Sequence, residues 1–380
     1  MRACVLVDVG RLELLDVPDP TPGPRDVLLS TSAVGLCGTD FHIFGGEMNF
    51  NLDERGQPIA LRDAPQILGH EITGVVQEVG SEVGGLAVGD RVVLDQGLSC
   101  VSAARDLCEY CASGDSHQCE GYIEHGITGL EGGFAEYVAT PGVNAVKIES
   151  DLDAARAAMT EPLGCILHSS DFAQRANTRY RIGDADPARK VRTALVCGAG
   201  PAGLLWIQVL RSVLGFDGTL LVAEIDDTKR EAARALGAEP IDPRATDLTE
   251  AVRERTSGRM VEYLVEATGN GPIFAQLPAL IRKQATFVMY GVGHGGASLE
   301  LMNQVQWKEP SLVLSVGASG GFDDDGRPTI YRRALHLIED GKVDVASIAS
   351  HRYEGLERIP EAFGGDHAQP GYVKGVALFG

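Results

Sequence analysis

A glycine-rich turn in the middle of the chain constrains the fold more than any other feature of the sequence. The apolar run 193–197 leads into Gly198-Ala199-Gly200-Pro201-Ala202-Gly203, and an apolar helical pattern follows over 204–210. A lone G-x-G-x-x-G is weak evidence, but the order strand, glycine turn and helix is that of a dinucleotide-binding unit. Its glycines let the backbone approach a pyrophosphate at a helix N-terminus, where unpaired N–H groups favour an anion.

The acidic residue that completes this fingerprint is Glu224, at the end of a second apolar run, 219–223. Its carboxylate would accept hydrogen bonds from the ribose hydroxyls of the cofactor and would repel a 2′-phosphate. We therefore expect NAD rather than NADP. Lys229 and Arg230 follow closely enough to keep NADP as the alternative.

Alternating strand and helix patterns continue after Glu224, with strand ends in 263–269, 286–293 and 312–321. Such alternation predicts an α/β domain with a doubly wound parallel sheet, whose ligand lies at the carboxyl ends of the strands. The opening of the chain differs, because residues 1–34 alternate short Val/Leu-rich runs with Pro-rich turns, and 26–34 predicts a strand leading into a loop at Cys37. We therefore expect a β-rich first domain.

The ends of the chain are expected to belong to one domain, because a helix over 330–342 and a strand over 374–379 follow the cofactor-binding pattern. The chain would leave its first domain, build the second and return. The predicted bounds are 1–170 for the first segment of the first domain, 171–318 for the cofactor domain and 319–380 for the returning segment. Residues 46–66 and 175–192 read as loop-rich insertions, and the former would either frame a substrate pocket or be a surface insertion without a function.

Chemically competent side chains gather in two short stretches of the first domain. Cys37 supplies a thiolate, and the pair His70 and Glu71 supplies an imidazole and a carboxylate, a mixed set that suits Zn²⁺. Thr39 and His42 offer a hydroxyl and an imidazole, the parts of a short proton relay. The stretches predict a catalytic metal site.

Composition excludes some classes of partner. The formal net charge is −20, so a phosphate backbone or an anionic membrane would be repelled, and the simplest reading of the acidity is a solvated surface. No run of about 18–20 apolar residues is present, and Asp8 comes too early for the apolar core of a signal peptide. Eight cysteines, four of them within 100–119, favour metal thiolates in a reducing cytoplasm, where we expect the protein to reside.

The blocks 35–42, 69–80, 88–94 and 132–138, together with the glycine turn, resemble the zinc-dependent medium-chain alcohol and polyol dehydrogenases. The resemblance covers nearly the whole chain. It implies a GroES-like β-rich catalytic domain, a Rossmann cofactor domain, catalytic zinc, hydride transfer with NAD(P), and a homodimer or homotetramer. The acidic Glu161, in 160–164, resembles the residue that the sorbitol, threonine and glucose dehydrogenase branch places beside the zinc.

The resemblance also implies roles for individual residues. Thr39 and His42 would carry the alcohol proton to solvent, and Asp40 would orient His70. We expect these catalytic residues: Cys37, Thr39, His42, His70, Glu71 and Glu161. We expect catalytic zinc at Cys37, His70, Glu71 and Glu161, although whether Glu71, Glu161 or a water completes the shell is open. The expected cofactor-binding residues are Gly198, Gly200, Pro201, Ala202, Gly203, Glu224, Thr268, Gly291, Val292, Gly317 and Ala318.

A second, structural zinc is expected in a lobe over about 98–120. Cys108, Cys111 and Cys119 have the spacing of the last three ligands of the family's structural site. The usual fourth position holds Arg105, so Cys100 would have to serve, with the intervening residues looped out. A metal-free lobe with free thiols, or a disulfide, is the alternative.

The activity that follows is oxidation of a secondary alcohol of a polyol, sugar or cyclitol to a ketone, or the reverse. A threonine-type or simple alcohol dehydrogenase is the second possibility. A zinc-free NAD(P)-binding reductase, or a non-catalytic binding protein, belongs to another class and predicts no catalytic zinc.

Overall fold

The computed structural model describes residues 1–296, 298 and 300–379, and its contacts divide the chain into two compact units. The first unit contains Met1–Gly164, Ala318–Gly341 and Ala349–Gly380, and the second contains Cys165–Gly317 and Lys342–Ile348. The chain therefore leaves the first unit and returns to it, as expected. Unlike the predicted bounds, the short segment Lys342–Ile348 groups with the second unit.

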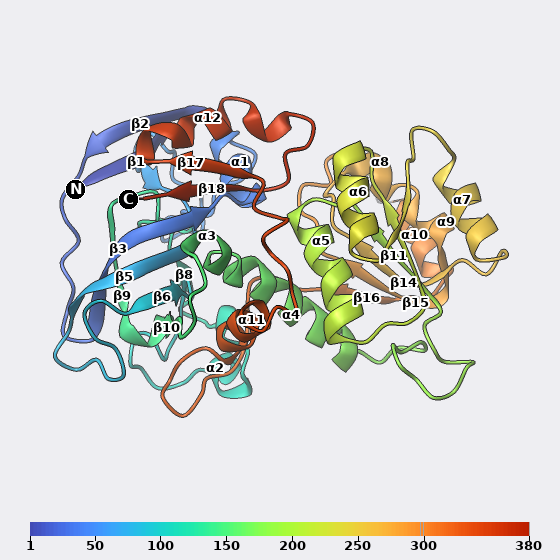
Figure 1. Ribbon diagram of the computed structural model, residues 1–380, viewed down its shortest axis with the longest axis horizontal. Coiled ribbons are helices and arrows are strands. Elements are labelled where there is room, and N and C mark those ends of the chain that lie inside the picture. Colours follow the sequence, from blue (N-terminus) through green and yellow to red (C-terminus); the bar gives the residue numbers. More distant parts are fainter. Residues whose placement is uncertain (297, 299, 380) are drawn as a thin grey trace. The chain divides into compact units, whose positions relative to one another are not determined.

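The first unit is built on β-structure that is antiparallel except for the parallel pair β17 and β18, and it is drawn mainly in blue and cyan in Figure 1. Its main sheet has the order β10-β6-β5-β3-β18-β17, with β9 also paired to β3, and a smaller sheet has the order β2-β1-β4. The strands of the main sheet are β3 (Asp26–Gly35), β5 (Glu71–Val79), β6 (Arg91–Leu94), β9 (Tyr137–Pro141), β10 (Ala145–Lys147), β17 (His351–Glu354) and β18 (Gly375–Leu378). The smaller sheet contains β1 (Arg2–Asp8), β2 (Arg11–Asp16) and β4 (Gln66–Ile67).

Buried and partly buried residues alternate along β3, and this alternation places one face of the sheet against the apolar core. Successive residues of β3 alternate between partly buried and buried until Ala33, after which they are all buried. The buried side chains of β3, such as Val27 and Leu29, join one apolar cluster with Phe134 and with Ala377 of the last strand. The C-terminal β18 pairs antiparallel with β3, with Val376 opposite Gly35. Residues far apart in sequence thus meet at the end of β3.

Helices and a small hairpin complete the first unit. The helices are α1 (Gly38–Phe44), α2 (Glu109–Ser113), α3 (Ala154–Ala157), α11 (Thr329–Glu339) and α12 (Ile359–Phe363), and α4 (Thr160–Arg175) begins in this unit. The hairpin pairs β7 (Gly97–Leu98) with β8 (Ile123–Glu124). Cys37 lies between β3 and the helix α1, and the sequence analysis did not predict that helix. Asp40, in its first turn, accepts a hydrogen bond from the Cys37 N–H at 2.8 Å and so stabilises the helix start.

The second unit is a six-stranded parallel sheet with the order β13-β12-β11-β14-β15-β16. Its strands are β11 (Thr193–Cys197), β12 (Thr219–Ala223), β13 (Glu239–Ile241), β14 (Val261–Glu266), β15 (Ile281–Met289) and β16 (Ser311–Leu314). Numbered along the chain, this is the 3-2-1-4-5-6 order of a doubly wound dinucleotide-binding fold. Every residue of β11 and β14 is buried, as expected for strands covered on both faces.

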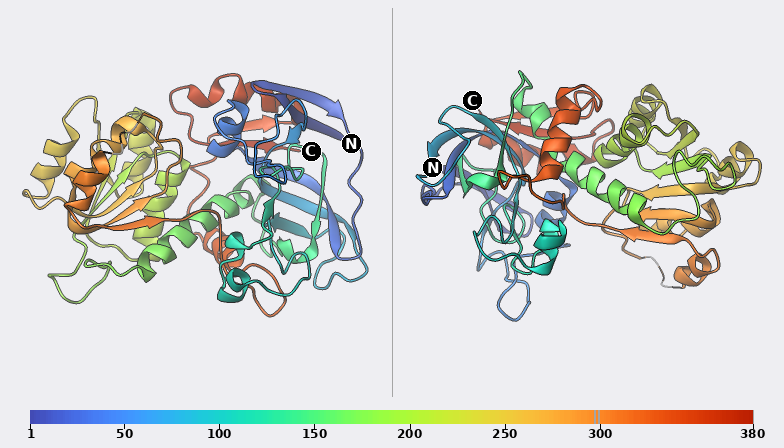
Figure 2. Two further views of the ribbon diagram at one scale, coloured as in Figure 1. Left: turned by 180° about the vertical axis from the view of Figure 1, so that it is seen from behind. Right: turned by 90° about the horizontal axis from the view of Figure 1, so that it is seen from below.

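Helices cover both faces of this sheet. They are α5 (Pro201–Gln208), α6 (Asp227–Ala235), α7 (Leu248–Arg255), α8 (Gly271–Phe274), α9 (Leu277–Leu280) and α10 (Leu301–Gln306). The views from the front and from behind show α5 and α6 over one face and α9 and α10 over the other (Figures 1 and 2). The expected helix over 204–210 begins earlier, at Pro201, and its end continues as a π-helical turn over Val209–Val213.

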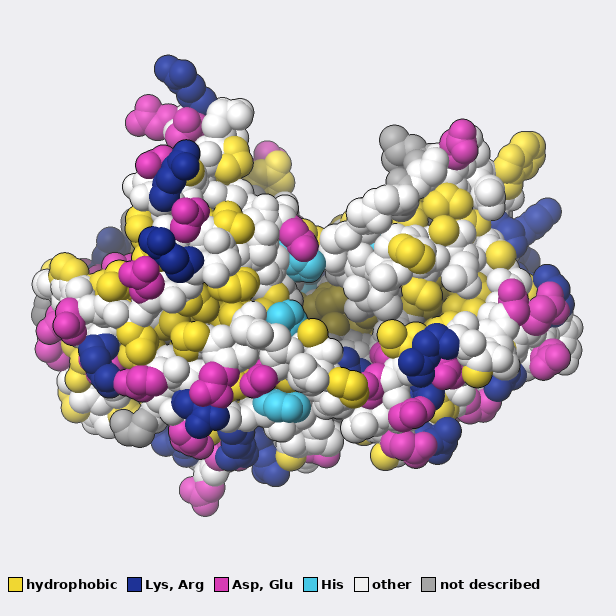
Figure 3. Space-filling model, turned by 90° about the horizontal axis from the view of Figure 1, so that it is seen from above, with side chains coloured by type: hydrophobic (Ala, Val, Ile, Leu, Met, Phe, Trp, Pro, Cys, Tyr) yellow, Lys and Arg dark blue, Asp and Glu magenta, His cyan; other side chains and the backbone are white. Residues whose placement is uncertain are grey.

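Acidic side chains are scattered among basic ones over the face shown in Figure 3, as expected for a solvated surface. Within the described part of the chain, no helix is long and apolar enough to span a bilayer.

Candidate active site

Three of the expected metal ligands come together at the C-terminal end of β3, where β3 pairs with the starts of β5 and β18. The ligand atoms of Cys37, His70 and Glu71 all lie within 4.8 Å of one another. Cys37 directly precedes α1, whereas His70 and Glu71 lie at the start of β5. The antiparallel pairing of β3 with β5 places Gly35 opposite Glu71. The sheet register therefore brings the two sequence motifs together.

Asp40 connects the two segments that carry these ligands. Its carboxylate is fully buried and accepts hydrogen bonds from the N–H groups of Cys37, at 2.8 Å, and Gly69, at 3.2 Å. The same carboxylate lies 3.4 Å from Nδ1 of His70, a position from which it can orient the ring and leave Nε2 for a metal. Burial alone would lower the pKa of His70, but the charges of Asp40 and Cys37 outweigh it and hold that pKa well above its ordinary value.

A buried lysine completes the cluster, and the sequence analysis missed it. Lys374, just before β18, forms an ion pair with Oε1 of Glu71, and both residues are buried. Burial by itself lowers the pKa of the ammonium, but the negative charges of Glu71 and Cys37 raise it above the ordinary value. A single cation inside the otherwise apolar run 372–379 was the only signal in the sequence.

The other carboxylate oxygen of Glu71 supports a metal at this position. Oε2 is buried and has no hydrogen-bond partner among the described residues. Glycine at position 35 makes room for it, since a Cβ there would lie 1.9 Å from Oε2. An unpaired buried carboxylate oxygen is costly, and a cation beside it would remove the cost. Thiolate, imidazole and carboxylate together form a donor set that fits Zn²⁺.

Glu161 lies near enough to this cluster for its charge to act on Lys374, but it is not among the three residues with mutually close ligand atoms. It occupies the first turn of α4 and is buried. Its Oε1 accepts a hydrogen bond of 3.2 Å from Nε2 of Gln96, and the amide oxygen of Gln96 accepts one from the Tyr331 hydroxyl. Gln96 and Tyr331 therefore position Glu161, and neither carried a motif that sequence analysis could recognise.

The two relay candidates occupy α1. Oγ1 of Thr39 lies 3.7 Å from the Cys37 sulfur. His42 is not packed into the core: its side chain is 31% exposed, and Nδ1 lies 2.5 Å from Oε2 of Glu47. Glu47 belongs to the insertion 46–66, so that segment reaches at least one of the expected site residues.

The four cysteines of the lobe form a second, separate cluster. The sulfurs of Cys100, Cys108, Cys111 and Cys119 lie within 4.8 Å of one another, and those of Cys100 and Cys119 are 3.5 Å apart. Cys100 thus joins the other three, and all eight cysteines of the chain are free, so the disulfide alternative is not realised. Four convergent sulfurs are the donor set of a structural zinc site.

The thiols of this cluster differ in acidity. Hydrogen bonds from the backbone N–H groups of Cys111 and Glu120 lower the pKa of Cys108 to about 6. Burial raises the pKa of Cys111 to about 12, and it also raises the pKa of Cys119. A zinc ion bound here would displace the protons of the less acidic thiols.

A buried histidine connects the cysteine lobe to the returning segment of the first unit. Nε2 of His117 lies 3.1 Å from Asp95, and Nδ1 accepts a 3.1 Å hydrogen bond from the N–H of Ala318. The charge of Asp95 outweighs burial and raises the pKa of His117, but the Ala318 N–H requires an unprotonated Nδ1. The neutral tautomer with hydrogen on Nε2 satisfies both neighbours. Ala318 was expected to bind cofactor. In the structure its N–H group donates to His117 and so links the returning segment to the cysteine lobe.

The second unit contains the glycine turn at the carboxyl end of β11. The close approach of α5 to this turn requires glycine at position 203, because a Cβ there would lie 2.0 Å from the carbonyl oxygen of Gly198. Glu224 follows β12 directly, and its carboxylate accepts a 2.7 Å hydrogen bond from the N–H of Ala199 within the turn. The structure therefore brings the two parts of the fingerprint into direct contact.

The other expected cofactor residues of this unit follow the ends of neighbouring strands. Thr268 comes after β14, whereas Gly291 and Val292 come after β15. The fully buried Glu266 accepts a 2.7 Å hydrogen bond from the N–H of Thr268 and lies 2.6 Å from Nε2 of His294. The sequence analysis assigned no role to Glu266 or His294.

Comparison with known proteins agrees with this architecture. Residues 23–150 match the alcohol dehydrogenase GroES-like domain family, and residues 201–340 match the zinc-binding dehydrogenase family. The chain is 30% identical over 352 residues to an L-threonine 3-dehydrogenase of Pyrococcus abyssi, covering 92% of this chain and 90% of that protein. The chain belongs to the zinc-dependent medium-chain alcohol dehydrogenase family.

Two further relatives show how broad this dehydrogenase family is. A sorbitol dehydrogenase of Halalkalibacterium halodurans is 30% identical over 90% of this chain and 89% of its own length. A zinc-binding dehydrogenase of Sinorhizobium meliloti, solved with NADP bound, is 29% identical with a TM-score of 0.78, covering 99% of this chain and 98% of that one.

Membership confirms several expectations from the sequence. The protein is an oxidoreductase of the zinc-dependent NAD(P) type, with a GroES-like domain and a Rossmann-type domain. It acts on a small molecule, and alcohol or polyol oxidation is the activity of its class. Membership and the intact ligand cluster together argue against the zinc-free alternative.

Proposed function

We propose that this dehydrogenase oxidises a secondary alcohol of a polyol, sugar or cyclitol to a ketone, or catalyses the reverse reduction, with NAD as the preferred cofactor. The observation that carries the proposal is the Cys37, His70 and Glu71 cluster, with the unpaired buried oxygen of Glu71 and the acidic Glu161 nearby. An acidic ligand set suits a polyhydroxylated substrate. The sorbitol dehydrogenase relative agrees with this class.

Zinc, when bound, would stabilise the alkoxide form of the substrate electrostatically, and nicotinamide would accept the hydride. The chain's own residues would hold and deprotonate the alcohol. Cys37 and His70 would bind the metal, and Asp40 would fix the His70 ring. Thr39 would accept the hydroxyl proton, and His42 would pass it towards solvent, with Glu47 beside its exposed ring.

The surroundings of Glu224 support NAD over NADP. Arg230 donates to the carbonyl oxygens of Glu224 and Ile225 and forms ion pairs with Asp227 and Asp242. Arg244 is likewise engaged by Asp242. Both guanidinium groups are therefore occupied, so neither is available for a 2′-phosphate without giving up existing partners. We expect Glu224→Ser to weaken selection against NADP.

Oxidation of a 3-hydroxy amino acid is the second candidate, favoured by the L-threonine 3-dehydrogenase relative. A homodimer or homotetramer stays a proposal, supported by β16 at the edge of its sheet, where Leu314 is 55% exposed. Light scattering on the purified protein tests it. A cytoplasmic location also stays a prediction.

The experiment that tests the function measures reduction of NAD⁺ and NADP⁺ across polyols, sugars, inositols, threonine and simple alcohols. Zinc is quantified in the same preparation. We expect turnover of a polyhydroxylated compound with NAD⁺ and about two zinc ions per chain, one for each cluster. Turnover confined to threonine would favour the second candidate. Cofactor binding without turnover, in a protein without zinc at Cys37, would refute the proposal.

A further inference from the structure

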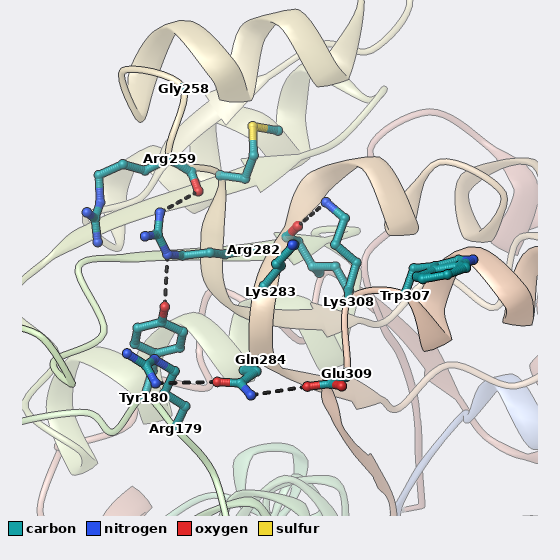
Figure 4. Close-up of a pocket in the computed structure, with 12 residues that line it drawn as sticks. Arg179, Tyr180, Gly258, Arg259, Arg282, Lys283, Gln284, Trp307, Lys308 and Glu309 are labelled. Atoms are coloured by element: carbon teal, nitrogen blue, oxygen red, sulfur yellow. Dashed lines mark hydrogen bonds between the residues drawn. The ribbon is translucent and has the colours of Figure 1, made fainter.

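The second unit contains a pocket that the dehydrogenase reaction does not use. It has a volume of about 750 Å³ and lies at the amino-terminal ends of β14, β15 and β16 (Figure 4). Cofactor in a doubly wound sheet binds at the opposite, carboxyl ends of the strands. We call this cavity the basic pocket, after its lining residues Arg179, Arg259, Arg282, Lys283 and Lys308.

The charge of the basic pocket is opposite to that of the chain. Five Lys or Arg residues line it against one acidic residue, Glu309. The whole chain has 33 Lys and Arg against 53 Asp and Glu. The carboxylate of Glu309 accepts a 3.2 Å hydrogen bond from the amide of Gln284, with no described cation as its partner. A concave cluster of cations in such an acidic protein focuses a positive potential on one place.

Within the described residues, most of these cations have no carboxylate as counter-ion. Among the residues that the structure describes, Arg259 has a carboxylate partner, Glu262, at 3.0 Å. Arg282 instead donates to the Tyr180 hydroxyl at 2.9 Å and to the backbone oxygen of Arg259 at 3.1 Å. These neutral partners fix the position of the guanidinium but leave its charge uncompensated.

The positive charges of the two lysines in the basic pocket are likewise not compensated by a carboxylate of the described residues. Nζ of Lys308 donates to the backbone oxygen of Ile281 at 2.9 Å, and Figure 4 shows Lys283 beside it. Burial and the positive charge of Lys283 lower the pKa of Lys308. An anion between the two ammonium groups would reverse this repulsion. The arrangement therefore favours a ligand that carries negative charge.

The backbone around the basic pocket adopts an unusual conformation. Met260, Gln284 and Glu309 have positive φ angles of 62°, 60° and 48°. They are three of the five non-glycine residues with positive φ in the described part of the chain. Such backbone is costly and tends to persist at sites that bind ligands. The rim also includes Trp307, which is 84% exposed and offers a ring face to a ligand.

We propose that the basic pocket binds a small anion carrying two or more phosphate groups. The planar guanidinium groups of Arg179 and Arg282 suit phosphate oxygens, and Lys283 and Lys308 supply further charge. The volume is within the range of small-molecule sites, about 300–1,000 Å³. Free pyrophosphate and a nucleoside diphosphate share this chemistry, and Trp307 would distinguish them by stacking on a base.

The test is calorimetric titration of the full-length, zinc-loaded protein with pyrophosphate and, separately, with ADP. The cofactor site is saturated with NADH, because its glycine turn also binds phosphates. We expect pyrophosphate to bind, and both Lys283→Gln and Arg179→Gln to weaken binding about tenfold or more. Lys342→Gln is the matched control: it removes the same charge from an exposed site of the second unit and should leave the Kd unchanged. Tighter binding of ADP that Trp307→Ala abolishes would identify a nucleotide as the ligand.

Several results would overturn the proposal. Wild-type protein that binds neither anion would do so, as would equal weakening by Lys283→Gln and Lys342→Gln, which would indicate a diffuse charge effect. Dissociation of an oligomer by Lys283→Gln and Arg179→Gln, with pyrophosphate binding unchanged, would mean that a second copy of the chain occupies the basic pocket. The test does not depend on the alcohol substrate.

Discussion

The two ligand clusters of the first unit are assembled in opposite ways. The four cysteines come from one short stretch, residues 100–119, and present identical sulfur donors. The catalytic cluster draws on the residue before α1, the start of β5 and the residue before β18, and its ion pair joins Glu71 to Lys374 across 303 positions of sequence. Closed four-sulfur sites are typical of structural zinc, whereas mixed sites with an open position are typical of catalytic zinc.

This difference in ligands predicts that the cysteine cluster serves the stability of the fold and that the mixed cluster serves catalysis. In the cysteine cluster each sulfur faces other sulfurs, so metal would serve to fix the lobe. In the catalytic cluster an ammonium occupies one oxygen of Glu71, and the other oxygen is unpaired. The unpaired oxygen of Glu71 could therefore contact a metal while Lys374 keeps the other oxygen. Four experiments test this contrast.

The largest effect is expected from Cys37→Ser, which removes a ligand of the catalytic cluster alone. We expect kcat/KM to fall about 10³-fold or more, because the metal contributes several kcal/mol to transition-state stabilisation. Zinc content should fall from about two ions per chain to about one, since the cysteine cluster is untouched. Metal analysis and steady-state kinetics measure both. Cys165→Ala, at a cysteine of neither cluster, is the control, and full activity in Cys37→Ser would contradict the assignment.

Cys111→Ser, which removes a ligand of the cysteine cluster, should reduce stability strongly and activity only weakly. Structural zinc contributes directly to folding, so we expect the free energy of unfolding to fall by several kcal/mol and the Tm by about 10 °C. The kcat of the molecules that remain folded should stay within about tenfold of wild type. Calorimetry and kinetics on the same sample check this. A folded variant with no activity would show that the two clusters are not separable.

Lys374→Met tests the ion pair of the catalytic cluster. Removing the ammonium leaves a buried carboxylate uncompensated, which costs about 3–5 kcal/mol in the metal-free protein. Zinc would compensate that charge, so the stability loss should shrink when metal is added, and competition with a chelator should show tighter zinc binding. We expect kcat to fall about 10–100-fold, because Glu71 would then occupy the position needed by substrate. Lys374→Arg keeps the charge and should restore most of the activity; equal losses in both variants would argue for a packing role.

The smallest effect is the pH dependence of zinc binding at the cysteine cluster. The pKa of Cys108 is depressed to about 6 from an ordinary value of 9.0. The contribution of the Cys108 thiolate to the stability of the folded protein is therefore complete above pH 9.0. It is lost as the pH falls through about 6. Below that pH one more proton competes with zinc. The apparent affinity for zinc should then fall by a further factor of about ten for each pH unit. Chelator competition from pH 5 to 8 in the Cys37→Ser background measures this, and a constant slope would contradict it.

The parts of the fold predicted from sequence were those with local signals. The glycine turn, the strand before it and Glu224 were found because the fingerprint places them within about 30 residues. The cysteine lobe was found for the same reason. The helix after Cys37 was missed because α1 is short and is held by Asp40, which bonds to Cys37 and Gly69 together. Only the folded register of β3 and β5 creates that pair of contacts.

The family, the order of domains and the chemical types of the candidate ligands could be predicted from the sequence alone, because periodicity and motif spacing are local properties of the chain. The charges that share the candidate site follow instead from tertiary packing. Lys374 reaches Glu71, and Tyr331 reaches Gln96, because the returning segment packs against the first unit's own strands. The basic pocket likewise exists only where three strand starts meet. Contacts between distant segments follow from how buried surfaces pack, and no local pattern of residues specifies them.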